Sequence, residues 1–385
     1  MNELEMIKNN STKSILQELF NNKVTTRAEI SRSVGLNKST ISSIYDTLKQ
    51  LNLVEELGEG EASNLGGRKP TKIRINANYG FTVSFDISFH NLHYMANLLN
   101  GEIVTQGKVS IYGDETAEIL KIIDDKIKHF LATVKTDRGL LGICFSVHGV
   151  IDDNQIIYSP FVDLENIDLH RMFAEKYEVP VLIENESNLV ALYARDFLNK
   201  NTIENLIVVS IHKGIGSGVI INGNLFRGFH GQAGEIGQML VSKNGGTYAD
   251  IEQLWSEDAM IKFLAKSLNI ETFSRELLIK YLNEKNNVVE KVIADFVSEI
   301  ARSIYNISKF CASDTVYLCS PLMEEEPLIF QKITKEVDIL NKKNKRSYEI
   351  KLNLIEHSNQ ATLLGACSLI THHVLHLDDF DLNFN

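Results

Sequence analysis

Two short helical segments joined by a turn at Gly35 constrain the fold of the amino-terminal part most strongly. Residues 26–29 have the sequence T-R-A-E, the form of a capping box, which predicts the start of a helix. Gly35 adopts a positive φ at no steric cost, so the chain can turn tightly there, with Leu36 filling the turn. Asn37 then caps a further helix from residue 38 to about residue 51. This spacing predicts a helix-turn-helix, whose second helix enters the major groove of DNA.

Another helical segment precedes this pair, because the residues N-S-T at 10–12 can cap a helix. Apolar residues recur at helical spacing in all three segments. Those expected to face the core are Ile15, Leu16, Leu19 and Phe20 in the first, Ala28, Ile30 and Val34 in the second, and Ile41, Ile44, Leu48 and Leu51 in the third. The opposite face of the third helix offers polar side chains that can approach DNA, namely Lys38, Ser39, Thr40, Ser42, Ser43 and Tyr45. The alternative is an ordinary helical hairpin with a polar face toward solvent.

A basic, glycine-rich segment follows the helices. Residues 53–54 and 73–75 alternate like two short strands, and a polar stretch from residue 58 to residue 67 separates them. Two glycines then precede Arg68 and Lys69, and Pro70 holds this basic pair extended, a form suited to a narrow DNA minor groove. We therefore predict a winged helix in which Arg68 and Lys69 contact DNA. The same residues would also suit a solvated linker between domains.

The charge of the chain, -11 in total, is divided unevenly. Residues 1–80 contain 11 basic and 9 acidic residues, whereas the remaining 305 residues contain 28 and 41. A small, nearly neutral segment with basic patches on an acidic body fits a DNA-binding head joined to a ligand-binding body. We therefore predict a head over residues 1–80 and a body over residues 81–385.

Membrane and secreted classes are not favoured by this sequence. No uninterrupted apolar run reaches the roughly 18 residues of a membrane span, and the acidic amino terminus lacks the apolar run of a secretory signal. The four cysteines, which are Cys144, Cys311, Cys319 and Cys367, show no C-x-x-C spacing. We expect buried thiols in a reducing cytosol, a cytoplasmic protein, and no membrane partner.

From residue 81 onward, strand-like and helical segments alternate. Apolar runs at residues 81–88, 141–147, 181–183 and 206–211 predict strands, and residues 115–131 predict a helix. Asn100 and Gly101 have the sequence of a hairpin turn. This pattern predicts an α/β body with a mostly parallel sheet.

Four motifs follow one another in this body. Residues 145–150 read F-S-V-H-G-V, residues 184–188 E-N-E-S-N, residues 214–218 G-I-G-S-G, and residues 228–238 G-F-H-G-Q-A-G-E-I-G-Q. Over nearly the whole chain this ordered set resembles the ROK family (repressors, open reading frames and sugar kinases), whose motifs are S-V-P-G-x-V, E-N-D-A-N, G-I-G-G-G and G-x-x-G-x-A-G-E-I-G-H. With the winged head, the resemblance is nearest to the xylose repressors of Gram-positive bacteria. It implies an actin-like ATPase fold with two lobes, approximately 81–190 plus 365–385 and 191–364.

The positions at which a kinase of this family binds nucleotide are altered. The family's D-I-G-G-T turn corresponds to residues 86–90, where Ser88 and Phe89 place side chains at the phosphate position. The second glycine pair is replaced by residues 319–321, C-S-P, and Glu186 stands where the kinases have an Asp general base. We therefore expect no ATP binding and no enzymatic activity. The alternative is a ROK sugar kinase with an accessory DNA-binding head.

The positions that bind sugar hydroxyls in the family are better kept. The resemblance implies effector binding by Asn185, Glu186, Glu235, Gln238 and Glu252, and overall similarity favours D-xylose as the sugar. Gln238 replaces the family's histidine, and the three-cysteine zinc motif is missing from residues 241–247, so no metal is expected. His148 replaces a proline and is expected to be a hydrogen-bonded structural residue. The alternative for each acidic or amide group is an ordinary polar residue at a loop end.

Head and body together predict a sugar-responsive repressor. It would bind a palindromic operator as a homodimer and lose DNA affinity when a sugar enters the cleft between the lobes. Two alternatives stay open: the kinase described above, and a constitutive DNA-binding protein whose body is vestigial.

Overall fold

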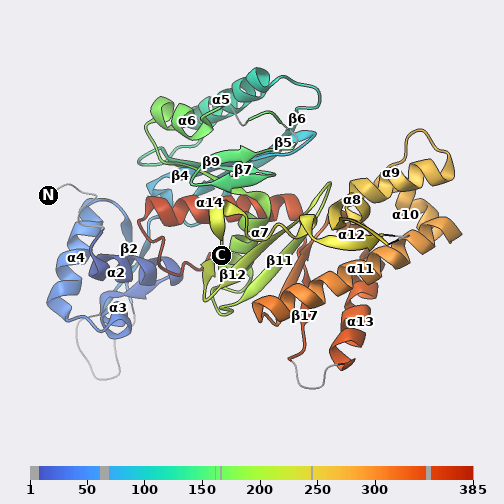
Figure 1. Cartoon of the computed structure of the whole chain (residues 1–385). Helices are drawn as coiled ribbons and strands as arrows, with labels where there is room; N and C mark the ends of the chain where they lie inside the picture. The colour runs from blue at the N-terminus through green and yellow to red at the C-terminus, as the bar shows by residue number, and fades with distance from the viewer. Residues whose placement is uncertain are drawn as a thin grey trace. The chain divides into compact units, whose positions relative to one another are not determined.

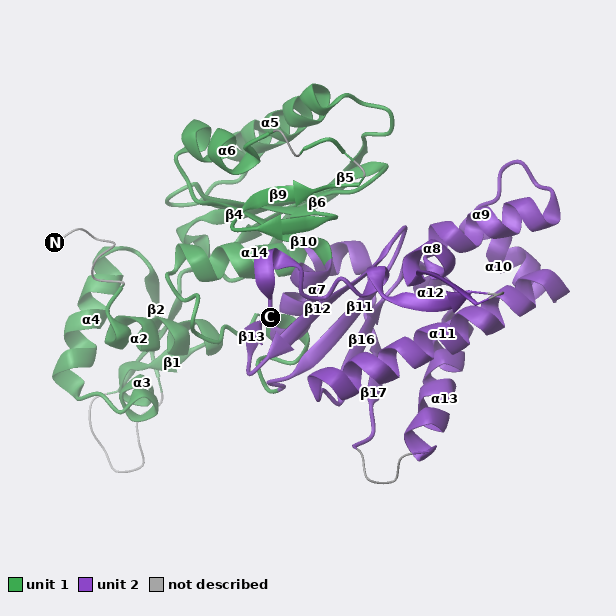
Figure 2. Ribbon diagram, viewed as in Figure 1, with its two compact units in different colours: residues 1–186, 196–202, 363–385 green, residues 187–195, 203–362 purple. Residues whose placement is uncertain are grey.

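The computed structural model describes residues 8–60, 69–160, 162–164, 167–243, 246–343 and 348–384. The chain forms two units (Figure 2). Unit 1 contains residues 1–186, 196–202 and 363–385, and therefore includes the head; unit 2 contains residues 187–195 and 203–362.

The head begins with three helices, α2 (Asn10–Asn21), α3 (Arg27–Val34) and α4 (Lys38–Gln50) (Figure 1). Side chains cap all three, because Thr26 and Asn37 accept hydrogen bonds from the backbone N–H groups of Glu29 and Thr40, as predicted. The cap of α2 is Asn9, one residue before the predicted position. Gly35 ends α3 with a φ of 69°, which confirms the predicted turn.

The core of the head contains most of the apolar residues predicted for it, and two predictions about this core were wrong. Ala28 is exposed, because it lies on the opposite side of α3 from the buried Ile30, two residues away. Tyr45 is only 3% exposed and does not belong to the polar face, because it lies one turn after the buried Ile41. Its hydroxyl donates a hydrogen bond of 2.7 Å to Glu56.

A three-stranded antiparallel sheet completes the head. β2 (Val54–Glu59) pairs with β3 (Thr71–Ile75), as predicted. β1 (Thr25–Thr26) pairs with the other edge of β3 and was missed, because a two-residue strand has no periodicity to detect. The intervening residues 61–68, with the predicted contact Arg68, lie outside the described part of the chain.

The body part of unit 1 contains a sheet of five strands in the order β10-β7-β4-β5-β6. Its strands are β4 (Phe81–Ile87), β5 (Asn91–Leu98), β6 (Ile103–Ser110), β7 (Leu140–Val147) and β10 (Val181–Asn185), and β8 (Val150–Asp152) and β9 (Gln155–Tyr158) form a separate hairpin. Helices α5 (Thr116–Thr133) and α6 (Leu169–Tyr177) cover one face (Figure 1). Helix α14 (Ser358–Val374) packs on this sheet too, so closely that a side chain at Gly142 would collide with Ile370.

Unit 2 has its own five-stranded sheet, in the order β13-β12-β11-β16-β17. The strands are β11 (Leu206–Ile211), β12 (Ile215–Ile221), β13 (Asn224–Leu225), β16 (Thr315–Cys319) and β17 (Lys351–Leu354), and β14 (Leu240–Lys243) pairs with β15 (Thr247–Asp250) beside it. The helices are α7 (Glu186–Tyr193, beginning in unit 1), α8 (Ile251–Trp255), α9 (Glu257–Leu268), α10 (Arg275–Asn283), α11 (Asn287–Cys311), α12 (Pro321–Glu325) and α13 (Pro327–Lys343). The core of unit 2 joins the sheet to α11 and α13.

The prediction of a mostly parallel sheet was wrong, because both five-stranded sheets are mixed. β4, β7 and β10 run parallel, whereas β4, β5 and β6 are antiparallel. In unit 2, β12 runs antiparallel to β11, and β16 and β17 run parallel to it. The short links at residues 88–90, 99–102 and 212–214 can only return the chain beside itself, which produces antiparallel pairs.

In the described part of the chain, no helix is long and apolar enough to cross a membrane. All four cysteines are free thiols. Three are buried, as expected, whereas Cys311 is partly exposed at the end of α11.

Candidate effector and DNA sites

Asn185 and Glu186 lie where β10 ends and α7 begins, in unit 1. The Asn185 side chain donates a hydrogen bond of 2.6 Å to the carbonyl of Gly149, which fixes the orientation of the amide. Gly149 has a φ of 144°, and a Cβ there would lie 2.0 Å from the carbonyl oxygen of Tyr158, so only glycine fits. The Glu186 carboxylate is 4% exposed and stands at the amino end of a helix, which favours a negative charge.

A buried acidic group lies at the end of β4, in the same unit. Asp86 is 3% exposed and accepts a hydrogen bond of 2.6 Å from Ser146, and the Nε2 atom of His148 lies 3.6 Å from the same carboxylate oxygen. Burial alone would raise the pKa of Asp86. The hydrogen bond and positive charge of His148, together with the hydrogen bond from Ser146, outweigh burial and lower that pKa. Burial likewise opposes protonation of His148, but Asp86 outweighs it and raises the pKa of His148. The sequence singled out His148 as structural but did not identify this partner.

The turn after Asp86 is braced by side chains. The backbone N–H and the hydroxyl of Ser88 both donate to the carbonyl of Asn91, at 3.0 and 2.8 Å. The Phe89 ring lies 4.4 Å from the His90 ring, which lies 4.7 Å from the Tyr112 ring. This turn therefore carries side chains, unlike a glycine-rich turn whose backbone N–H groups approach a nucleotide phosphate.

Glu235, Gln238 and Glu252 come together in unit 2. The Gln238 side chain, which is exposed, donates a hydrogen bond of 2.9 Å to Glu235. Burial raises the pKa of Glu235; the hydrogen bond from Gln238 opposes this rise, and the negative charge of Glu252 adds to it. Glu252 accepts a hydrogen bond from the backbone N–H of Ile215 at 3.4 Å, which holds it beside β12. Three of the five predicted effector residues thus form one acidic and amide cluster.

Glycines hold the motifs of unit 2 against one another. Gly234 has a φ of 87°, and its carbonyl accepts hydrogen bonds from both the backbone N–H and the hydroxyl of Ser217. A Cβ at Gly234 would lie 2.0 Å from the Ser217 carbonyl oxygen. Similarly, a Cβ at Gly218 would lie 2.2 Å from the carbonyl oxygen of Ser187 on α7. These close approaches pack the residue before Glu235 and the α7 residue Ser187 directly against β12.

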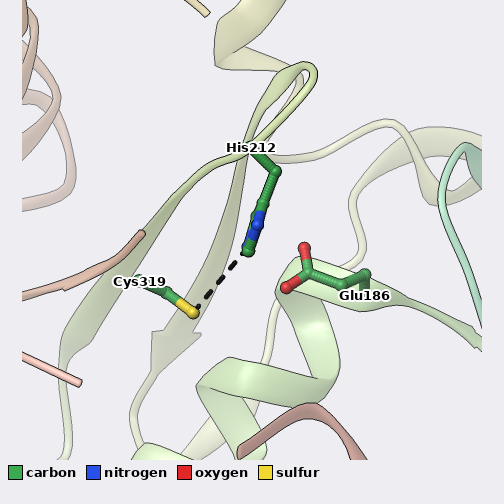
Figure 3. Close-up of side chains that lie close together, drawn as sticks. All are labelled: Glu186, His212 and Cys319. Carbon is green, nitrogen blue, oxygen red and sulfur yellow. Dashed lines mark hydrogen bonds between the residues drawn. The ribbon is translucent and has the colours of Figure 1, made fainter. Parts of the chain in front are cut away.

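Two groups of metal-ligand type lie near the ends of β11 and β16. The Nε2 atom of His212 is 4.0 Å from the Sγ atom of Cys319, and Figure 3 draws this contact together with Glu186, the first residue of α7. Imidazole and thiolate are zinc ligands, but a structural zinc site takes four ligands. At 4.0 Å, the contact between His212 and Cys319 is a weak hydrogen bond.

The candidate DNA surface of the head lies on the first two turns of α4. Lys38, Ser39 and Ser43 are exposed there, and Thr40 and Ser42 are half-buried. The Ser39 hydroxyl also donates to the Asn37 cap at 2.6 Å. On the wing, Lys69 is exposed, and its Nζ atom lies 3.9 Å from Glu59, a weak contact that leaves the cation accessible.

Several known proteins are similar to this chain over most of its length. The model of the ROK family matches residues 82–373. The chain is 39% identical over 383 residues to the xylose repressor of Lactiplantibacillus pentosus, covering 98% of this chain and 96% of that protein. A solved ROK family transcriptional regulator, a homologue of the E. coli MLC protein, superposes with a TM-score of 0.79 at 18% identity, over 98% of each chain. A ROK family glucokinase from Streptomyces griseus, solved with glucose and AMPPNP, gives a TM-score of 0.65 at 17% identity, over 75% of this chain and 99% of its own.

Proposed function

Because the chain belongs to the ROK family, we propose that it is a sugar-responsive transcriptional repressor whose DNA-binding head is a winged helix-turn-helix. The observation that carries this proposal is the similarity to a xylose repressor along 98% of the chain, head included. A similarity limited to the body would support a sugar kinase equally well, because kinases of this family share the fold of the body. As a regulator of transcription, the protein would act in the cytoplasm, where the chromosome lies.

The head supports this proposal through its local geometry. The α3–Gly35–α4 turn presents the first turns of α4 as a recognition helix. The residues proposed to contact the operator are Lys38, Ser39, Thr40, Ser42 and Ser43 on α4, and Arg68 and Lys69 on the wing. Short hydroxyl side chains suit close approach to base edges, whereas the basic wing residues suit phosphates and the minor groove.

The proposed effector is a sugar, and D-xylose is favoured because the relative that matches nearly the whole chain is a xylose repressor. Its hydroxyls would be bound by Asn185, Glu186, Glu235 and Glu252, with Gln238 acting through Glu235 or directly. Carboxylates and amides suit neighbouring hydroxyls, because an analogue that lacks one hydroxyl leaves a buried partner unpaired.

Loss of kinase chemistry is part of the same proposal. Ser88 and Phe89 place interacting side chains on the turn where a kinase of this family has glycines without side chains. His148 holds the Asp86 carboxylate in an ion pair. A coupled assay of ADP release over a panel of pentoses and hexoses tests this point. Turnover well above a no-enzyme blank would favour the sugar kinase with an accessory head.

We further propose that the repressor is a homodimer on a palindromic operator, which pairs two heads with two half-sites. Unit 2 carries exposed apolar side chains near the end of α11, on the segment after β13 and at the start of β14, namely Phe226, Phe229, Leu240 and Phe310, the last 90% exposed. Phe226 and Phe310 also line a hollow of about 740 Å³. A face with both projecting apolar rings and an apolar hollow is suited to self-pairing about a two-fold axis.

The test of the proposed function is a fluorescence-anisotropy titration of the full chain against DNA from upstream of its own gene. Each sugar of the panel is added in turn, at constant salt because phosphate contacts make the affinity salt-dependent. Specific binding that one sugar weakens is expected. Binding that no sugar alters would favour a constitutive DNA-binding protein instead.

A further inference from the structure

The residues that follow α14 return to the head instead of ending in solvent (Figure 1). We name residues Leu377–Phe384 the strap. Its apolar side chains Leu377, Leu382 and Phe384 are each 0% exposed. They belong to the same apolar cluster as the core residues of α2. The core of the DNA-binding head is therefore completed by the far end of the chain.

Helix α2 holds the strap through one ring and several amides. The Phe20 and Phe384 rings meet edge to face with their centroids 4.8 Å apart. The side chains of Gln17 and Asn21 donate to the Asp381 carbonyl at 3.0 and 2.9 Å. The oxygen of the Asn21 side chain accepts from the backbone N–H of Asn383 at 2.8 Å. These contacts fix the strap to α2 along several consecutive residues.

The opposite side of the strap contacts the segment that follows α7. The Phe197 ring stacks on Phe384 at 4.7 Å, and the Phe384 N–H donates to the carbonyl of Asp196 at 3.2 Å. Asn201 donates a hydrogen bond of 2.9 Å to the carbonyl of Leu382. The strap therefore lies between the head and residues 196–202, all within unit 1.

A buried polar network fixes the start of the strap as well. Asp196 is 0% exposed and accepts a hydrogen bond from Ser368 on α14. The Nε2 atom of His372 lies 3.4 Å from Asp196, and its Nδ1 atom lies 2.9 Å from the carbonyl of Leu377. Asp196 belongs to a π-helical turn, Ala194–Leu198, that directly continues α7. Such turns are rare in helices and occur often at functional positions.

We propose that the strap transmits effector binding to the DNA-binding head. The inference rests on the proposed function, because Glu186, a proposed sugar ligand, is the first residue of α7. A shift of α7 moves Asp196 and Phe197, and these carry Phe384 and hence α2 with them. Packed interfaces of this kind change between discrete arrangements and do not deform continuously. The head also contacts the body at Asp137, which accepts hydrogen bonds from Asn52 and Asn76 at 2.7 and 3.0 Å. This contact would serve as the pivot about which the head turns.

The test compares a double variant with a matched control in the full chain. Gln17→Ala with Asn21→Ala removes the polar contacts from α2 to the strap and leaves the apolar core intact. Gln50→Ala, an exposed position at the end of α4, is the control. Operator Kd is measured with and without the sugar that releases the wild type. Allosteric factors are typically about 5- to 150-fold. We expect the double variant to bind sugar-free operator within about 3-fold of wild type, and its sugar effect to fall below about 2-fold.

A second measurement needs no sugar. Coupling is reciprocal, so operator binding at the head should slow hydrogen–deuterium exchange in residues 194–202 of the wild type. The double variant should lose that change, whereas the control should keep it. Phe384→Leu, which retains an apolar side chain, is expected to lose less of it than Phe384→Ala.

The outcomes separate the two proposals. A wild type that no sugar releases contradicts the proposed function. If operator does not change hydrogen–deuterium exchange in residues 194–202 of the wild type, the proposed role of the strap is wrong. It is also wrong if operator changes this exchange equally in the double variant. A sugar effect that the double variant retains in full overturns it as well.

Discussion

The Nε2 atom of His148 lies 3.6 Å from the carboxylate of Asp86, the first residue of the segment that corresponds to the D-I-G-G-T turn of ROK kinases. The two residues stand on neighbouring parallel strands, at the end of β4 and just after β7. A buried carboxylate at the end of β4 is thus paired with an imidazole of the same chain.

The Asp86–His148 pair predicts a pH dependence of stability. The pKa of His148 is raised above its ordinary 6.5, so its contribution is complete below that value and is lost as pH rises through the raised pKa. The pKa of Asp86 is lowered below its ordinary 3.8, so its contribution is complete above that value and is lost as pH falls through the lowered pKa. The pair therefore stabilises most between these two ordinary values. Urea unfolding measures the free energy of unfolding at pH 5 and at pH 8.5. This free energy should fall more from pH 5 to pH 8.5 in the wild type than in His148→Gln. An equal fall in both proteins would contradict the stabilising role of the pair.

Asn37→Ala should destabilise the head. The side chain of Asn37 caps α4 by accepting from the Thr40 N–H at 2.9 Å, and losing such a cap costs about 0.5–2 kcal/mol. Operator affinity should fall with it, because the same turn carries the proposed DNA contacts. Asn37→Asp keeps an accepting oxygen and serves as the control in the unfolding titration. If both variants unfold alike, the cap is not what orders this helix.

Gly234→Ala should be far more damaging than Gly223→Ala. Both glycines have positive φ, 87° and 75°, which costs a side chain about 1–2 kcal/mol. A Cβ at Gly234 also meets the Ser217 carbonyl at 2.0 Å, whereas Gly223 faces open space. The additional cost is about 1–3 kcal/mol, and sugar binding should weaken because Glu235 adjoins Gly234. Chemical denaturation of the pair measures the difference, and similar values would refute the close approach.

Glu235→Gln should weaken sugar binding while leaving sugar-free operator binding intact. Hydrogen bonds to a charged group contribute about 1.5–3 kcal/mol, which corresponds to at least about a tenfold rise in sugar Kd. Isothermal titration with the identified sugar measures this rise. Glu284→Gln, at an exposed position in the same unit, should bind sugar like the wild type. An unchanged Kd for Glu235→Gln would remove Glu235 from the effector site.

Phe310→Glu should yield a monomer. Phe310 is 90% exposed at the end of α11, and a charge there would oppose burial in the proposed self-paired face. Light scattering after gel filtration gives the mass of each variant. Leu131→Glu, an exposed position on α5, should remain dimeric. A dimeric Phe310→Glu protein would place the interface elsewhere.

Much of the head could be predicted because its signals are local. Thr26, Gly35 and Asn37 specify caps and a turn within a few residues, and each forms as expected. Tyr45 was misplaced because a polar hydroxyl on a large ring suggests an exposed position, whereas the ring continues the buried stripe of Ile41. The mixed sheets were missed because β4 and β11 are buried along their whole length, a pattern typical of parallel strands, yet each also has an antiparallel neighbour.

The long-range contacts could not be predicted from the sequence. Asp86 and His148 meet only because β4 and β7 are neighbours, and Phe20 and Phe384 meet only because the chain returns to its beginning. The effector residues were proposed from family resemblance, and the contact between Glu235 and Gln238 emerged only in the structure. Spacing in the sequence carries no information on such pairs.

The most direct test of the central claim is one linked pair of titrations on the wild type. Operator Kd is measured with and without saturating D-xylose, and D-xylose Kd with and without saturating operator. A repressor whose sugar and DNA sites are coupled must show the same factor in both directions, and we predict weaker binding in each. Two affinities that are each unaffected by the other ligand would contradict the account.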